Sequence, residues 1–231
     1  MGGAVTTTNA ISDFVSYSAK PMGQIQNTSG YSGAGPMQVP WNNLNGALSS
    51  ANDVLTSIEE DNLEIVIDGS DQTAKTRAGA YLVRGLSHGY IANIFNQGYV
   101  QTLDFPQNPS QPALSGYGAV VDQAISDLQQ ARDIAENNSF NLSGFFPWDS
   151  PPSSAQVARS ANTMSARFLV QNSRTLDENT GSTIGGSEQY GWSDVLGWTE
   201  SGVEEDISLQ ISTNPYEDDY AGLSTFINWY Y

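Results

Sequence analysis

The fold is decided by one long amphipathic stretch, residues 71–97, which reads DQTAKTRAGAYLVRGLSHGYIANIFNQ. Small and apolar residues recur in it three or four positions apart, the period of a helix with one buried face. These residues are Ala74, Ala78, Tyr81, Leu82, Gly85, Gly89, Ala92 and Phe95. Gly79, Gly85 and Gly89 would each cost up to about 1 kcal/mol relative to alanine inside a helix. We therefore expect another helix to pack very close to this one.

Four further segments show the same helical period, and together they predict an all-α fold. They are residues 41–60, 115–138, 153–176 and the shorter 192–206. Consecutive long helices would form antiparallel pairs joined by long loops, and two pairs of this size resemble tetratricopeptide repeats. Only LEIVID, residues 63–68, alternates in the manner of a strand.

Turn and capping residues mark the expected helix ends. Pro40 precedes the first helix, where proline is tolerated. Ser70 or Asp71 is the expected N-cap of the second helix, and Gly98 is expected to end it. Ser115 is expected to cap the third helix.

The chain divides by composition into three parts. Residues 1–40 are rich in Gly, Ser, Thr and Pro and predict an irregular N-terminal segment. Residues 41–210 form the expected helical domain, and residues 211–231 form an aromatic-rich tail. Two long loops, 102–115 and 139–153, interrupt the helices, and long loops of this kind often carry function.

The charge of the chain excludes some classes of partner. It has 25 acidic and 8 basic residues, a net charge of −17. Such a surface repels phosphate, so we expect no binding to nucleic acid or to anionic lipid. An acidic, well-solvated surface and adaptation to high salt are both compatible with this excess. No apolar stretch approaches the roughly 18 residues of a transmembrane helix, and no signal peptide is visible.

The chain offers little for catalysis, so we expect neither an enzyme nor a cofactor. It has no cysteine and a single histidine, His88, which argues against a transition-metal site. His88 is interpreted as a packed helix residue. Runs of adjacent acids occur at 59–60, 204–206 and 217–219, and such runs are usually solvated. A glycoside hydrolase with two facing carboxylates remains an open alternative. A calcium site in 61–71 is also open, although the spacing of an EF-hand is missing.

Aromatic residues are the better candidates for binding, because sugar rings stack on exposed aromatic side chains. Phe145, Phe146 and Trp148 lie with Asp149 in a proline-flanked loop. Tyr216 and Tyr220 lie in the C-terminal tail. These six residues are the candidate ligand-binding residues. The alternative is that they only pack against the scaffold, as we expect of Trp41, Trp192 and Trp198.

Four segments, in order, resemble the SusD/RagB-like family of outer-membrane nutrient-binding lipoproteins. The first is KTRAGAYLVRGLSHGYIANIFNQGYV (75–100), with an Arg-Ala pair, a small-residue stripe and a late Phe. The others are AVVDQAISDLQQARDIAE (119–136), ARSANTMSARFLVQNSRT (158–175) and YGWSDVLGWTESGVEEDI (190–207). They cover roughly residues 40–210.

The resemblance implies a non-catalytic protein that captures oligosaccharides or similar polymer-derived ligands at the cell surface. It implies lipid anchoring on the outer membrane, with a signal and a lipidated cysteine in the native precursor, and a TonB-dependent (SusC-like) transporter as partner. Members of the family are usually longer, with a loop-rich C-terminal part that carries much of the ligand surface. The alternative function is a tetratricopeptide-like protein-interaction scaffold with no ligand of its own.

Overall fold

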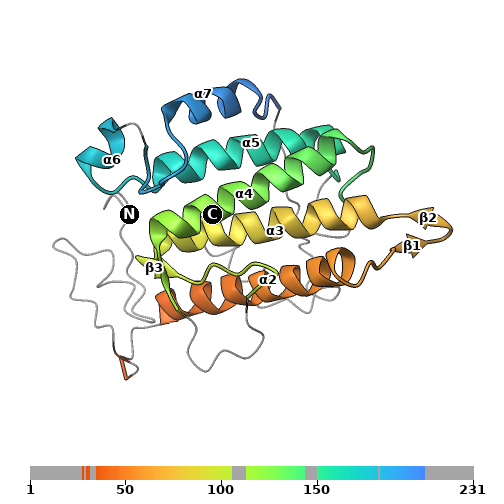
Figure 1. Cartoon of the computed structure of the whole chain (residues 1–231), viewed down its shortest axis with the longest axis horizontal. Helices are drawn as coiled ribbons and strands as arrows, with labels where there is room; N and C mark the ends of the chain where they lie inside the picture. Colours follow the sequence, from red (N-terminus) through yellow and green to blue (C-terminus); the bar gives the residue numbers. More distant parts are fainter. Residues whose placement is uncertain are drawn as a thin grey trace, which may run out of the picture. The chain divides into compact units, whose positions relative to one another are not determined.

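The computed structural model describes residues 28, 30–31, 35–105, 113–143, 150–181 and 183–205, and these are predominantly helical (Figure 1). The described helices are α2 (Gly35–Glu59), α3 (Thr73–Ile94), α4 (Tyr117–Glu136), α5 (Ser154–Gln171), α6 (Leu176–Thr180) and α7 (Trp192–Glu200). Two short antiparallel pairs join β1 (Val66–Ile67) to β2 (Ser70–Asp71) and β3 (Gln97–Gly98) to β4 (Ser115–Gly116). The prediction of an all-α fold is confirmed.

The chain consists of two compact units, Met1–Ala47 and Leu48–Tyr231. The boundary falls within α2, which begins at Gly35 rather than near residue 41. Pro40 therefore lies inside this helix instead of preceding it, at the cost of one backbone hydrogen bond. In the second unit, the rest of α2 buries Leu48, Ala51, Leu55 and Ile58, which recur three or four positions apart along one face of the helix.

Successive helices of the second unit pack against one another in antiparallel order (Figure 1). Helix α3 packs along α4, α4 packs along α5, and α5 contacts α7. The core at these contacts consists of small and branched side chains, with Val120, Ile125, Leu128, Phe168 and Leu169 fully buried. The second helix of the sequence is thus enclosed by its neighbours, as its pattern predicts.

The glycines of α3 mark the points of closest approach. A Cβ atom on Gly85 would lie 2.8 Å from Cγ of Leu128 and 3.0 Å from the carbonyl oxygen of Ala124, both on α4. A Cβ atom on Gly89 would lie 2.2 Å from the ring of Phe168 on α5. The expectation that another helix packs very close to α3 is confirmed, and α3 meets two such helices.

Alanine at Gly89 is expected to lower the free energy of unfolding by about 1–3 kcal/mol, because the new methyl group overpacks the Phe168 ring. Gly197, inside α7, is the matched control, since a Cβ atom there would meet nothing within 4 Å. Gly197→Ala should instead stabilise the chain by up to about 1 kcal/mol through helix propensity. Urea denaturation followed by circular dichroism measures both variants. Equal effects of the two substitutions would contradict the close contact.

The helix ends differ from the sequence-based expectations by a few residues. Helix α3 begins after Gln72, with the Asp71 carboxylate accepting the amide of Thr73 at 2.8 Å. It ends at Ile94, and Gly98 instead lies in β3, where a Cβ atom would approach Ile91 to 2.5 Å. Ser115 pairs in β4 and Gly116 is the N-cap of α4. Strand pairing thus competes with the expected caps for these residues.

The predicted helix over 153–176 is two helices, because a second capping box interrupts it. Helix α5 begins at a capping box between Ser153 and Gln156 and ends at Gln171. Thr175 and Glu178 form another capping box, which starts α6. Between them, Arg174 extends its guanidinium to the carbonyl oxygens of Ala92 and Phe95 at the end of α3. Ala92 lies in the last turn of α3 and Phe95 is its C-cap residue, so Arg174 helps to cap this end of the helix.

The predicted strand over 63–68 is reduced to a small exposed hairpin. Only Val66 and Ile67 pair, with Asp71 and Ser70. Asp68 and Gly69 have φ values of 51° and 77°, which suits the tight turn that twists such a hairpin correctly. Among the described residues, the pairing of this hairpin does not extend beyond these two positions.

The two tryptophans of α7, Trp192 and Trp198, differ in burial. Trp198 is buried and contacts Tyr190 edge to face, whereas Trp192 is 41% exposed, so its assignment to the core is wrong. Trp192 instead lies at the start of α7, where its indole N–H donates to the carbonyl of Asn179 at 3.1 Å.

None of the helices in the described ranges is long and apolar enough to cross a membrane.

Candidate functional site

The six aromatic-loop and tail residues predicted to bind a ligand lie outside the described residues. Phe145, Phe146, Trp148 and Asp149 fall within 144–149, and Tyr216 and Tyr220 fall within 206–231. The flanks of the first segment are described. The amide of Leu142 donates to the carbonyl of Pro152 at 2.8 Å, and Asn141 pairs with Ser153. Both ends of that loop therefore emerge side by side, and its binding role stays a prediction.

His88 is fully buried, and both of its ring nitrogens are engaged. Its Nε2 accepts the backbone amide of Gln101 at 3.1 Å, and its Nδ1 lies 3.1 Å from Oδ2 of Asp127. Since the amide can only donate, Nε2 carries no proton and Nδ1–H donates to the carboxylate. The interpretation of His88 as a packed residue with a satisfied ring is confirmed. A ring held in this way has no nitrogen with which to reach a substrate.

Asp127 and Arg84 form the centre of a buried polar cluster between α3, α4 and the second half of α2. The Arg84 guanidinium lies 2.7 Å from Oδ1 of Asp127 and donates to Oδ1 of Asn52 at 2.8 Å. Asn52 in turn donates to the carbonyl of Thr102 at 3.0 Å, and Gln123 donates to Asp127 at 2.9 Å. The cluster links three helices and the segment after β3, so we assign it a structural role.

Because the chain is strongly acidic, the helical arginines Arg77, Arg159 and Arg167 are expected to pair with carboxylates, and two of them do. Arg77 lies 3.8 Å from Glu59, and Arg159 lies 2.5 Å from Glu204. Arg167 donates to the side-chain oxygen of Gln171 at 3.3 Å, with no carboxylate within ion-pair distance among the described residues. The ion-pair expectation is wrong for Arg167, because its neighbour one helical turn on is an amide.

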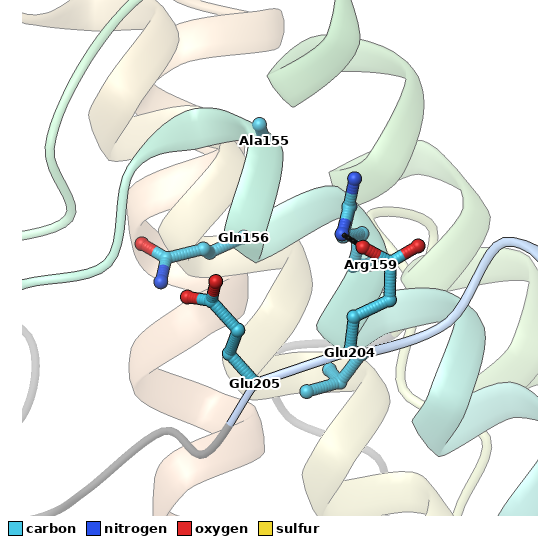
Figure 2. A pocket seen from close by; sticks show the side chains of 6 residues that line it. Ala155, Gln156, Arg159, Glu204 and Glu205 are labelled. Carbon is cyan, nitrogen blue, oxygen red and sulfur yellow. Dashed lines mark hydrogen bonds and ion pairs between the residues drawn. The ribbon is translucent and has the colours of Figure 1, made fainter.

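A shallow hollow of about 160 Å³ lies beside the start of α5 (Figure 2). Ala155, Gln156, Arg159, Val203, Glu204 and Glu205 line it. Arg159 is paired with Glu204, and the amide oxygen of Gln156 accepts the backbone amide of Ser153 in the capping box. Figure 2 shows the remaining carboxylate, Glu205, beside Gln156. Most polar groups here already have protein partners, which leaves little for a ligand.

A larger hollow of about 320 Å³ lies between α4 and the loop before α7, and we call it the Asp122 hollow. Its lining consists of Ala119, Asp122, Gln123 and Ser126 from α4 and Gly186, Glu188 and Gln189 from the loop. The volume is at the lower end of the range for small-molecule sites. In the described part of the chain, the side chains of Ser126, Glu188 and Gln189 have no hydrogen-bond partner. The Asp122 hollow therefore retains free polar groups.

Glycines bring the loop down onto α4. A Cβ atom on Gly118 would lie 1.9 Å from the carbonyl oxygen of Gly186, so only glycine allows this approach. Gly185 and Gly186 have φ values of 66° and 70°, in the left-handed region that glycine adopts freely. The loop can consequently place Ser187 and Glu188 directly over Asp122.

Asp122 is the deepest charged group of the hollow, with only 7% of its surface exposed. Its Oδ1 accepts the Ser187 hydroxyl at 2.5 Å, and its Oδ2 accepts the amide of Glu188 at 3.2 Å. The Ser187 oxygen also accepts the amides of Gln189 and Tyr190, at 3.0 and 2.8 Å. Burial raises the pKa of Asp122 above the ordinary value of 3.8, although its two hydrogen bonds oppose the rise.

This raised pKa predicts a pH dependence of stability. The folded chain holds the Asp122 proton to a higher pH than the unfolded chain, so folding loses stability as pH rises from 3.8 through the raised pKa. Asp122→Asn has no proton to lose. The stability of this variant minus that of the wild type should therefore be greater at about pH 7 than at about pH 3. Urea denaturation at both pH values measures the difference; an unchanged difference would contradict the burial effect.

Two carboxylates, those of Asp122 and Glu188, line the hollow. In the ranges that the structure describes, no three His, Asp or Glu side chains are grouped to bind one. The open calcium alternative for 61–71 receives no support from this part of the chain.

Sequence reasoning missed the hollow, because its lining comes from a helix and a loop about 65 residues apart. The Gly-Gly pair before Ser187 is the one local signal that could have indicated it.

No protein-family model matches the chain, and no similar protein was found among curated proteins or solved structures.

Proposed function

We propose that this chain is a non-catalytic binding protein that captures an oligosaccharide or a similar polymer-derived nutrient for an outer-membrane uptake system. The observation that carries the proposal is the Asp122 hollow, which offers hydroxyl, amide and carboxylate groups at one place that have no hydrogen-bond partner among the described residues. Such groups suit the hydroxyls of a sugar, which both donate and accept hydrogen bonds. The four segments that resemble SusD/RagB-like proteins indicate the same class of function.

The chemistry of the described residues favours binding over reaction. His88 is enclosed with both nitrogens engaged, so it is not positioned as a general base. Asp122 is held by Ser187 and the Glu188 amide. The second carboxylate of the hollow belongs to Glu188, whose own backbone amide binds Asp122, whereas a glycosidase needs two carboxyl groups that face each other across the scissile bond.

Calorimetric titration of the full chain with a panel of oligosaccharides tests the proposal. Binding to at least one of them is expected. Gln189→Ala should weaken it about five- to tenfold, the effect of losing one or two hydrogen bonds. Gln130→Ala is the matched control, since Gln130 is an exposed amide on α4 that does not line the hollow. Absence of binding to every sugar, or equal effects of the two substitutions, would count against a sugar site here.

The proposed transporter partner requires a separate experiment. Co-purification of the chain with a TonB-dependent transporter from outer-membrane extracts is the expected result. If a transporter is retained while no sugar binds, the scaffold function is favoured instead.

One observation favours the scaffold function, and it concerns the β1–β2 hairpin. Leu63, Val66 and Ile67 are 51%, 59% and 56% exposed there, an unusual grouping for apolar side chains on a monomer. If the hairpin holds a partner, polar replacements at Val66 and Ile67 should abolish transporter retention without changing sugar binding.

A further inference from the structure

The charge of the Asp122 hollow is uncompensated. Asp122 and Glu188 each contribute a carboxylate, and none of the described lining residues is basic. Neither carboxylate has an ion-pair partner among the described residues. The smaller hollow of Figure 2 differs in this respect, because Arg159 there neutralises Glu204. The two hollows thus differ in charge as well as in volume.

The protein environment fixes the Asp122 carboxylate without neutralising it. Its partners, the Ser187 hydroxyl and the Glu188 amide, are neutral donors. Burial raises the pKa of Asp122, these two hydrogen bonds lower it, and the nearby Glu188 carboxylate raises it further. A cationic group bound in the hollow would supply the missing counter-charge.

The rest of the lining suits a polyhydroxylated molecule. Ser126 is half-buried, and among the described residues neither its hydroxyl nor the side-chain amide of Gln189 has a hydrogen-bond partner. Gln123 uses its amide nitrogen on Asp127, which leaves its oxygen as an acceptor. Neutral donors and acceptors therefore surround two carboxylates, and a sugar with an ammonium group would match both kinds of partner. The net charge of −17 also attracts cations and repels uronic or sulfated sugars.

We propose that the Asp122 hollow selects saccharides that carry a free amino group, with Asp122 and Glu188 receiving the ammonium and Ser126 and Gln189 binding neighbouring hydroxyls. This inference rests on the proposed sugar-binding function and specifies its ligand class. The ammonium forms a charge-assisted hydrogen bond that neutral sugars cannot make.

The test compares three oligosaccharides of equal length by calorimetric titration of the full chain: glucosamine, N-acetylglucosamine and galacturonic acid oligomers. The glucosamine oligomer is expected to bind about tenfold or more tightly than its acetylated counterpart. The galacturonic acid oligomer should show no binding. Higher salt should weaken the glucosamine complex, because the contact between charges is partly screened.

Variants separate the site from general attraction to an acidic protein. Asp122→Asn and Glu188→Gln should each weaken glucosamine binding about tenfold, a larger loss than either causes for the acetylated oligomer. Glu204→Gln, on the hollow of Figure 2, should leave it unchanged. A lysine oligomer of equal charge should bind more weakly than the glucosamine oligomer.

The outcomes distinguish the two proposals. If neutral sugars bind as well as the glucosamine oligomer, the sugar-binding function stands and amine selection is overturned. If no sugar binds, both fail. If the lysine oligomer binds equally and Asp122→Asn has no effect, attraction is nonspecific and amine selection is overturned.

Discussion

Replacing Asp127 with alanine is expected to lower the free energy of unfolding by about 3–5 kcal/mol, the usual cost of leaving a buried charge without its partner. Asp127 is 1% exposed and accepts hydrogen bonds from Arg84, His88 and Gln123. Its removal would leave the Arg84 guanidinium, 4% exposed, without its counter-charge. Guanidinium denaturation followed by circular dichroism measures the loss.

Asp133→Ala on the same helix is the matched control for Asp127→Ala. Asp133 pairs with Arg132, but the Asp133 side chain is 51% exposed, so its replacement should cost less than about 1 kcal/mol. If Asp127→Ala does not fold, Asp127→Asn keeps one acceptor oxygen and should show an intermediate loss. Equal effects at positions 127 and 133 would contradict a stabilising role for the buried cluster.

Phe168→Ala is expected to cost about 3–5 kcal/mol, because it opens a cavity between α5 and α3. Phe168 is fully buried on α5, contacts Gly89 of α3 and packs edge to face on Tyr90 at 5.0 Å between ring centroids. Thermal or urea unfolding measures the loss. Val170→Ala on the same helix is the control, since Val170 is 38% exposed and should cost less than about 1 kcal/mol.

A double-mutant cycle sharpens this prediction. Once the ring is removed, the methyl group of Gly89→Ala has space, so its penalty should disappear and helix propensity should contribute up to about 1 kcal/mol of stability. Additive effects of Gly89→Ala and Phe168→Ala would show that the ring is not what excludes a side chain at position 89.

Helix content and the close packing of α3 could be predicted from the sequence. The small and apolar residues of α3, its glycines included, recur every three or four positions and so mark the side of the helix that faces its neighbours. This pattern lies within one segment and can be read without knowing the rest of the fold. Gly85 and Gly89 were read correctly for the same reason. The ends of the helices were less predictable: Gly98 and Ser115 are drawn into strand pairs, a contact between residues distant in sequence.

The candidate site could not be predicted in the same way. Asp122 and Asp127 lie on the same helix. Nothing in their local sequence shows that Asp127 accepts a hydrogen bond from Arg84 whereas Asp122 faces a hollow. The difference arises from the partner elements, since α3 supplies Arg84 to one and the loop at 184–190 supplies only neutral donors to the other.

By itself, the sequence determined that the chain is helical, that α3 packs closely against neighbouring helices, and that the protein is strongly acidic. Each follows from composition or from spacing within one segment. Only the tertiary structure decided which acidic side chains are neutralised and which remain open to a ligand. That distinction depends on distances between segments far apart in the chain, and these distances cannot be predicted from the spacing of residues along one segment.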